Sequence, residues 1–355
     1  MSRKKLPIGI QTFREIREDN CYYVDKTAFA LRMIKEGKAY FLSRPRRFGK
    51  SLFLDTLAEL FAGNEPLFRG LHCHDKWDWN TKYPVIRISF AAGVTESRGD
   101  LDARIHCILA ENEFRLGVSR GEGAIPDRFI ALIQAAAARF GQRVVVLVDE
   151  YDKPLLDNLR SPDLARGMRD GLRNFYSVIK DQDAHIKFAM LTGVSKFSKV
   201  NIFSGLNNLS DITLDAGYSN ICGYTDADVD TVFAPELAGL DRDEIRHWYN
   251  GYNWRGEAVY NPFDLLLLFN KREFRPFWFE TGTPTFLVDT LTERQVYLPR
   301  LLSMESSSEL ISAFEVGAIS TEALMFQSGY LTLHGEENIA GDLLFTLGFP
   351  NREVR

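Results

Sequence analysis

The chain has 355 residues, a net charge of −5 at neutral pH and 45% hydrophobic residues, a composition typical of globular proteins. This length allows two domains, or one large domain with an appendage, and the acidic balance argues against a general positive coat for nucleic acid. No apolar run is long enough to span a membrane, and no signal-peptide core follows the N-terminal residues. The four cysteines are widely scattered, which indicates a reduced, cytoplasmic protein.

The first stretch, residues 6–27, is apolar and aromatic, and Asp25 or Thr27 is a candidate cap for a helix that extends through Ile34. A segment of this kind, placed before a nucleotide-binding loop, can lie over the base of the nucleotide. It can equally pack against the edge of the sheet. The sequence leaves both alternatives open.

A basic loop follows, between a predicted strand and a predicted helix. Residues 39–43 are an apolar run that indicates a buried strand, and the apolar period over residues 52–62 indicates a helix that begins near Lys50. Between them, residues 44–51 read Arg-Pro-Arg-Arg-Phe-Gly-Lys-Ser, and the last three match the end of a phosphate-binding loop. Arg44 occupies the place of the first glycine of that pattern, so the match is incomplete.

The residues at the end of this loop suit a nucleotide phosphate. Gly49 lets the backbone approach an anion closely, and the N–H groups at the start of the helix point toward that anion. We expect Lys50 to reach the β- and γ-phosphates and the Ser51 hydroxyl to ligate Mg²⁺. The predicted nucleotide-binding residues are Arg46, Arg47, Phe48, Gly49, Lys50, Ser51 and Leu52.

Strands and helices alternate after the loop. The patterns predict strands over residues 84–90, 143–150, 185–193 and 212–214, and helices over residues 101–116, 127–139 and 161–180. Continuous apolar strands of this type are buried on both faces of a parallel sheet that helices cover. The sequence therefore predicts an α/β fold with a mostly parallel sheet flanked by helices.

Two of these strands end in residues suited to phosphate chemistry. Asp149 and Glu150 close the strand over residues 143–150, and in open α/β sheets ligands lie at the carboxyl ends of strands. We expect Asp149 to hold the Mg²⁺ shell and Glu150 to orient and polarise the attacking water. Thr192 or Ser195, at the end of the next strand, is a candidate for contact with the γ-phosphate or the water. The alternative is a hydroxyl that satisfies loop backbone.

The later part of the chain predicts a small helical group. Thr225 is a candidate N-cap for one helix, residues 241–249 form a second, and Pro262 stands at the start of a third over residues 264–270. We expect a helical or winged-helix lid over the nucleotide. Residues 323–330 then indicate a helix, and residues 331–334 the start of a hairpin.

Several segments together are more specific than the phosphate loop alone. They are residues 6–27, 41–51, 148–156, 191–214, 248–252, 259–263, 278–284 and 347–351. In these segments the chain resembles the AAA-ATPase-like family, whose members usually carry a PD-(D/E)xK nuclease-like domain after the ATPase. The resemblance covers essentially the whole chain, and it includes the Arg-Pro-Arg-Arg-Phe-Gly-Lys-Ser form of the loop, so Arg44 is no departure within that family.

The resemblance implies a P-loop NTPase that binds ATP and Mg²⁺, with Walker A and Walker B motifs at the loop and at the acidic strand. It further implies an ATPase core over residues 1–222, a lid over residues 223–290, and a connector over residues 291–355. The nuclease pattern needs an acid, then a second acid one residue before a lysine, and residues 149–153 hold these types in another order. We therefore expect no nuclease activity from this chain. DNA or RNA would be a partner only through the absent nuclease domain, and a homo-oligomer remains open.

Three functions remain open at this point. The first is an Mg²⁺-dependent ATPase, with Lys50, Glu150 and Thr192 as catalytic residues and Ser51 and Asp149 at the metal, that controls a C-terminal effector. The second is a nucleotide-binding switch with little turnover, which Arg44 in the loop motivates. The third is a nucleic-acid-associated module of a nuclease system, against which the acidic net charge argues.

Overall fold

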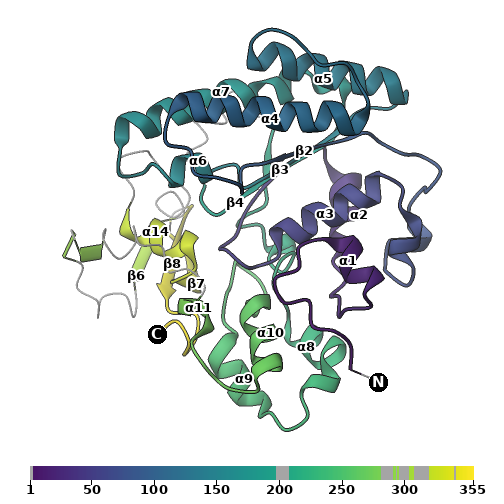
Figure 1. Cartoon of the computed structure of the whole chain (residues 1–355). Helices are drawn as coiled ribbons and strands as arrows, with labels where there is room; N and C mark the ends of the chain where they lie inside the picture. The colour runs from purple at the N-terminus through teal and green to yellow at the C-terminus, as the bar shows by residue number, and fades with distance from the viewer. Residues whose placement is uncertain are drawn as a thin grey trace.

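A five-stranded parallel sheet in the order β2-β3-β4-β1-β5 forms the centre of the molecule (Figure 1). The structure, a computed structural model, describes residues 3–196, 208–280, 291–292, 294–295, 304–307, 320–339 and 341–355. The strands are β1 (Ala39–Ser43), β2 (Val85–Ser89), β3 (Val144–Asp149), β4 (Ile186–Gly193) and β5 (Ser210–Asp211). The predicted α/β fold with a mostly parallel sheet is confirmed.

The central strands of the sheet are buried along nearly their whole length, because helices cover both faces of the sheet. Three long helices pack together above the sheet in Figure 1: α4 (Arg98–Leu116), α5 (Ile125–Phe140) and α7 (Pro162–Asp181). On the other side lie α1 (Phe13–Glu18), α2 (Thr27–Glu36) and α3 (Lys50–Phe61). The short α6 (Lys153–Leu156) follows β3. No helix within the described ranges is both long enough and apolar enough to cross a membrane.

The predicted strand over residues 212–214 is wrong, because the chain leaves the sheet after Asp211. The N–H of Thr213 donates to the Asp211 carboxylate (3.0 Å), and the Thr213 hydroxyl accepts from the backbone N–H of Ser43 (3.1 Å). These bonds turn the chain where a continued strand would keep it paired. The sheet partners of β1 are therefore Ser210 and Asp211.

A second group of helices lies at the bottom of Figure 1 and has its own hydrophobic core. Its members are α8 (Asp226–Val232), α9 (Arg242–Tyr249) and α10 (Pro262–Lys271), followed by α11 (Phe277–Glu280). The predicted starts are confirmed: Thr225 forms a capping box with Asp228, and Pro262 occupies the first turn of α10. A winged-helix arrangement of this group stays a prediction.

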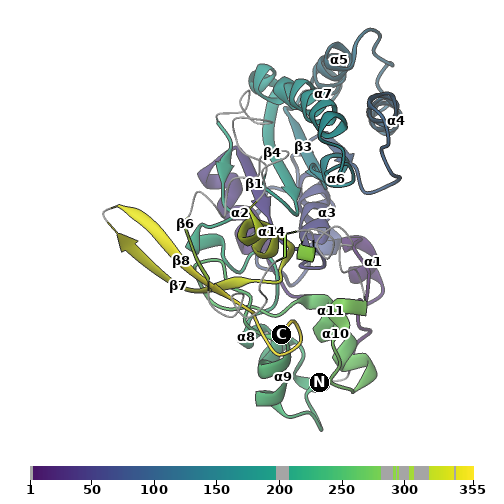
Figure 2. The same cartoon turned by 90° about the vertical axis from the view of Figure 1, so that its left-hand side faces the viewer.

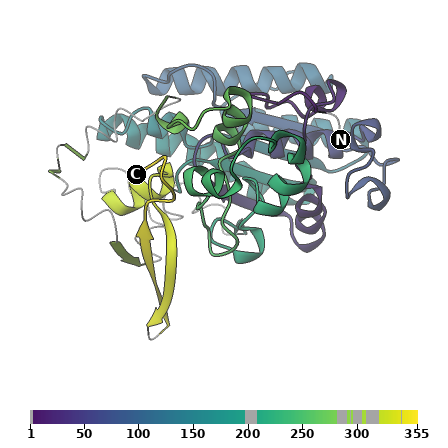
Figure 3. The ribbon, with the colours of Figure 1, turned by 90° about the horizontal axis from the view of Figure 1, so that it is seen from below.

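The C-terminal part contributes a helix and an antiparallel sheet. The helix is α14 (Thr321–Ser328), and the sheet has the order β6-β8-β7, with β6 (Met304–Ser307), β7 (Thr332–Ile339) and β8 (Asp342–Gly348). The hairpin of β7 and β8 projects from the body (Figures 2 and 3). Its position confirms the predicted hairpin, although the strands are longer than residues 331–334 indicated.

The N-terminal segment contacts both hydrophobic cores. Phe13 of α1 stacks near Tyr23 and Phe68 in the core around the sheet, with ring centroids 5.1 and 4.8 Å apart. Tyr22, the neighbour of Tyr23, packs in the second core, and its hydroxyl donates to the Glu236 carboxylate (2.9 Å). Adjacent residues of an extended chain point to opposite sides, so this segment joins the two parts.

A buried pair of acids connects α10 to the C-terminal segment (residues 348–355). Asp264 is 0% exposed and Glu353 is 3% exposed, and their carboxyl groups lie within hydrogen-bonding reach of each other. Burial raises the pKa of Asp264, and burial together with the Asp264 charge raises the pKa of Glu353. No described residue donates to either Asp264 oxygen or to Glu353 Oε2. We therefore expect the two carboxyl groups to share a proton in the folded state.

This pair predicts a stability that falls as the pH rises. Folding raises the pKa values of both carboxyl groups. The pair's contribution to the free energy of unfolding is therefore fully present below the unfolded pKa values of about 4, and it is lost as the pH rises through the pKa values of the folded state. The folded pKa values are about 7 for Asp264 and about 9 for Glu353, so we expect the thermal midpoint to fall as the pH rises from about 4 to about 9. We expect Glu353→Gln, which keeps a permanent donor toward Asp264, to flatten this fall. The measurement is a thermal melt at each pH, with the exposed Glu257→Gln as control. Equal pH profiles for wild type and Glu353→Gln would contradict the shared proton.

Candidate nucleotide-binding site

The basic loop lies at the carboxyl end of β1 and leads directly into α3, as predicted. Gly49 has φ 94°, a left-handed conformation that places it at the turn into the helix. Arg47 also has a positive φ, 69°, which is uncommon for a residue with a side chain. Such strained backbone persists where the surroundings hold it and is frequent at ligand sites. The loop therefore has the shape expected for close approach of its backbone to a ligand.

Arg44 points into the protein. Its side chain is fully buried, and the guanidinium donates to four carbonyl oxygens, those of Ser43, Thr213, Tyr218 and Ser219, at 2.8–3.4 Å. It also stacks on the Trp254 ring at 4.3 Å. Burial lowers its pKa to about 10, so the group stays charged at neutral pH. Arg44 thus anchors the base of the loop, and the positive charge near the loop's surface comes from the other two arginines.

The remaining predicted loop residues divide into exposed and buried side chains. Arg46 and Arg47 are exposed, and the Arg47 guanidinium lies 4.3 Å from the centre of the Phe263 ring in α10. Phe48 is buried against Tyr252, with ring centroids 4.8 Å apart, so only its backbone faces the loop. Leu52, half-buried on α3, lines a small cavity described below.

Lys50 is buried beneath the loop. Its ammonium group donates to the backbone carbonyls of Arg44 (2.8 Å) and Pro45 (2.9 Å). Burial lowers its pKa, and the nearby charge of Asp149 opposes that shift. An ammonium group has three protons, so one donor remains for an anion in the loop. The hydroxyl of Ser51, on the next residue, has no hydrogen-bond partner among the described residues.

The acidic end of β3 lies beside the end of β4. The Thr192 hydroxyl donates to Asp149 Oδ1 (2.8 Å), and the Glu150 N–H donates to the same oxygen (3.1 Å). Glu150 has φ 51°, a second strained residue beside the loop. Burial and the charge of Asp149 raise the pKa of Glu150. The structure therefore brings Asp149 and Thr192 into contact, with Glu150 adjacent.

Asp152 is a residue of this site that the sequence did not single out. Its carboxylate is buried and accepts from the N–H groups of Val194 (3.1 Å) and Ser195 (2.6 Å) and from the Ser195 hydroxyl (2.5 Å). Burial raises its pKa. Ser195, the alternative to Thr192, is therefore engaged by Asp152. The sequence did contain a signal for this role, because Asp152 is a third acid two residues after the pair of Asp149 and Glu150. Residues 197–207, part of the loop expected near the phosphates, lie outside the described residues.

The aromatic N-terminal segment lies beside the loop, and both alternatives for it, a position over the nucleotide base and packing against the edge of the sheet, stay predictions. Residues Tyr22, Val24 and Lys26 line a cavity of about 60 Å³ together with Gly49 and Leu52. The cavity has room for about two water molecules, so a nucleotide base would need its walls to separate.

Comparison with known proteins agrees with this geometry. Residues 7–203, more than half of the chain, match the family described as Predicted AAA-ATPase (AAA-ATPase-like). The chain belongs to this family. A protein of Azotobacter chroococcum mcd 1, described as "Uncharacterized protein in vnfD 5'region", is 67% identical over 356 residues, a match that covers 100% of this chain and 69% of that protein. The family match of this AAA-ATPase-like chain includes the phosphate loop, Asp149 and Thr192.

The anchoring role of Arg44 gives a prediction on stability. Arg44→Met leaves buried carbonyl oxygens without a donor, and we expect the free energy of unfolding to fall by about 2–4 kcal/mol. The matched control is Arg46→Met, which changes an exposed arginine of the same loop and should alter that free energy by less than about 0.5 kcal/mol. Urea unfolding measures both. A fully stable Arg44→Met protein with weakened nucleotide binding would instead assign Arg44 to the ligand.

Proposed function

We propose that this AAA-ATPase-like chain binds ATP with Mg²⁺ and hydrolyses it. The observation that carries the proposal is the meeting of Lys50, Thr192 and Asp149 at the carboxyl ends of the adjacent strands β1, β4 and β3. A strand between the phosphate-loop strand and the acidic strand is the arrangement of the additional-strand P-loop ATPases that the sequence resembles. Family membership supports nucleotide binding.

The phosphates of ATP would lie in the loop. The backbone N–H groups at the start of α3 and the free proton of Lys50 would donate to their oxygens. Arg46 and Arg47 are exposed at the same loop and supply further positive charge. The Lys50 ammonium group donates to the carbonyls of Arg44 and Pro45, which holds it beneath the loop where it could also donate to a phosphate.

The oxygen groups at the site fit Mg²⁺, a cation that prefers carboxylate, hydroxyl and water ligands. Asp149 uses Oδ1 to accept from Thr192 and Glu150, while Oδ2 accepts no hydrogen bond from the described residues. The Ser51 hydroxyl stands at the first turn of α3. When bound, the ion would neutralise charge that develops on the transferred phosphoryl group. Thr192 would hold the Asp149 carboxylate in one orientation.

Glu150 is the candidate general base for the attacking water. Its raised pKa brings its basicity nearer to neutral pH, where a general base is most effective. Its backbone is left-handed, and the charges of Lys50 and Arg46 in the loop lie near enough to oppose the rise of its pKa. Asp152 would act as a positioning residue, because it holds the backbone that follows Thr192.

The nucleotide state would be transmitted to the helical group. We place the ATPase core at residues 1–222, the lid at 223–290 and the connector at 291–355. Arg47 of the loop lies over Phe263 in α10, and the next residue, Asp264, pairs with Glu353 in the C-terminal segment. A shift of the loop would therefore reach a C-terminal effector through two contacts. A switch with little turnover is the second candidate, since the buried Arg44 restrains the loop.

Two substitutions at the loop and at the acidic strand end should separate ATP binding from ATP hydrolysis. Lys50→Ala removes a charge-assisted donor, and we expect ATP affinity to fall about tenfold or more. Glu150→Gln should retain affinity and lose turnover by about 10²–10⁴-fold. Equilibrium binding and phosphate release, each with and without Mg²⁺, measure these effects, with Glu257→Gln as the surface control. Unchanged ATP affinity in Lys50→Ala would end the proposal. Binding without turnover in the wild type would favour the switch.

The second prediction concerns Thr192. Thr192→Val has nearly the same shape but no hydroxyl, so Asp149 loses one of its two donors and keeps only the Glu150 N–H. We expect turnover to fall about 10–100-fold and the Mg²⁺ requirement to rise, with ATP affinity measured without metal unchanged. Thr192→Ser keeps the hydroxyl and should retain most activity. Equal activity of the Val and Ser variants would remove Thr192 from the mechanism.

A further inference from the structure

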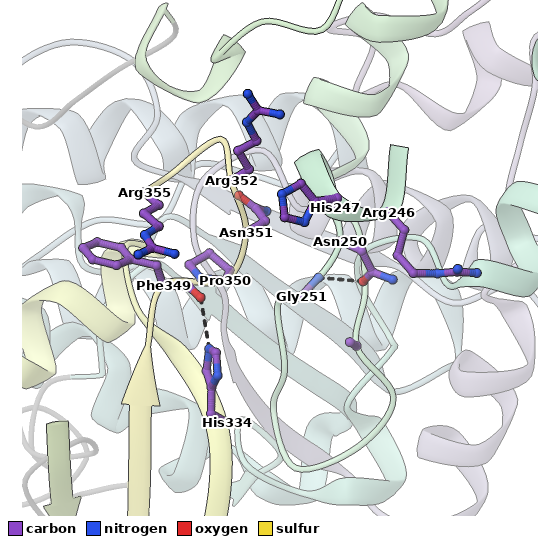
Figure 4. A pocket seen from close by; sticks show the side chains of 11 residues that line it. Arg246, His247, Asn250, Gly251, His334, Phe349, Pro350, Asn351, Arg352 and Arg355 are labelled. Atoms are coloured by element: carbon purple, nitrogen blue, oxygen red, sulfur yellow. Dashed lines mark hydrogen bonds between the residues drawn. The ribbon is translucent and has the colours of Figure 1, made fainter. Parts of the chain in front are cut away.

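A second hollow in the molecule shares no residue with the phosphate loop. It lies between the end of α9 and the C-terminal segment, and its volume is about 880 Å³ (Figure 4). Three arginines and two histidines line it, and no aspartate or glutamate of the described residues does. We call it the basic pocket and define it by Arg246, His247, His334, Arg352 and Arg355. This concentration of positive charge contrasts with the net charge of −5 of the chain.

The arginines of the basic pocket differ in whether a nearby carboxylate balances their charge. Arg246 pairs with Asp226 (3.3 Å) and Asp243 (2.9 Å), so its charge is balanced within the helical group. The guanidinium groups of Arg352 and Arg355 are exposed and have no carboxylate within 4 Å among the residues that the structure describes. Two exposed, unmatched guanidinium groups on one hollow favour an anionic ligand.

The position of Arg352 is fixed by the backbone. Its N–H donates to the His247 carbonyl (3.2 Å), and the N–H of Glu353 donates to the Trp248 carbonyl (3.3 Å). These carbonyls belong to the last turn of α9, whose partial negative charge would otherwise oppose an anion. The Arg352 guanidinium stacks over the Trp248 ring at 4.7 Å. Stacking restricts the side chain while leaving its N–H groups free to donate.

The walls of the basic pocket are also held closely. Gly251 has φ 121°, and a Cβ there would collide with the Pro350 carbonyl oxygen, so the two backbones touch. On the opposite wall, His334 Nε2 and the Phe349 carbonyl lie 3.0 Å apart, as the dashed line in Figure 4 marks. The hollow is therefore formed before any ligand arrives, which reduces the entropy lost on binding.

We propose that the basic pocket binds phosphate groups of a ligand of nucleotide size or larger. A guanidinium group can donate two parallel hydrogen bonds to two oxygens of one phosphate. The volume of the basic pocket, about 880 Å³, lies in the range of pockets that bind whole small molecules. Two sources carry such phosphates: a free nucleotide or polyphosphate, and a single strand of nucleic acid. This proposal is independent of ATP hydrolysis at the phosphate loop, because no residue is shared between the two sites.

The experiment uses fluorescence anisotropy of a labelled single-stranded oligothymidylate, with unlabelled tripolyphosphate as competitor, on the full chain. We expect wild type to bind at low salt, and Arg352→Glu to weaken binding about tenfold or more and to lower the slope of log affinity against log salt by about 1. The control is Arg143→Glu, which reverses an exposed arginine just before β3. Arg352→Gln, which removes the charge without reversing it, should weaken binding by a smaller factor, and thermal melts check that each variant is folded.

The outcomes separate the two sources of phosphate. Displacement of the strand by low concentrations of tripolyphosphate, with loss of that competition in Arg352→Glu, assigns the pocket to compact polyphosphates. A strand that binds through Arg352 and resists tripolyphosphate assigns it to nucleic acid. Either result supports the site. Equal weakening by Arg352→Glu and Arg143→Glu, or no binding of either probe at about 50 mM salt, would overturn it.

Discussion

The buried guanidinium of Arg44 is the interaction on which the candidate site depends. Its guanidinium donates hydrogen bonds to carbonyl oxygens at the end of β1 and in the segment after β5. The backbone carbonyl of Arg44 in turn accepts a hydrogen bond from Lys50. One residue thus fixes both the base of the loop and the lysine inside it. A buried cation needs hydrogen-bond acceptors, and here backbone carbonyls accept from the two terminal nitrogens of the guanidinium without any acid. The loop is held in place by hydrogen bonding where a glycine would have given flexibility.

The strand ends around the loop form one connected set. Asp152 accepts from backbone N–H groups after β4, Ser43 Oγ donates to the Val194 carbonyl (2.5 Å), and Thr192 donates to Asp149. Each bond links neighbouring strands at the same edge of the sheet. The acids and the loop therefore keep their relative positions without a ligand. Preorganised polar groups of this kind are the main means by which a protein stabilises charge in a reaction.

The sequence was informative where the pattern of apolar residues along the chain determined the structure. The central strands β3 and β4 were predicted within a few residues because they are continuous apolar runs, and the helices α4, α5 and α7 because their apolar residues repeat with the helical period. The direction of the Arg44 side chain was not predictable, since it depends on carbonyls about 170 residues later in the chain. The role of Asp152 was missed for the same reason. The strand at residues 212–214 failed because Thr213 uses its hydroxyl and carbonyl to satisfy the loop.

The division of Tyr22 and Tyr23 between two cores has a consequence for the order in which the chain folds. The hydrogen bond from Tyr22 to Glu236 spans 214 residues. During synthesis this tyrosine leaves the ribosome long before α8, α9 and α10 exist to receive it. The last strand of the sheet, β5, ends at Asp211, and α8 begins at Asp226, so the core around Phe13 and Tyr23 also needs more than half of the chain. Contacts between such distant residues form slowly, and exposed aromatic side chains are the surface that chaperones and aggregates recognise. The helical group can dock onto the N-terminal segment only after α10, which ends at Lys271, has been synthesised.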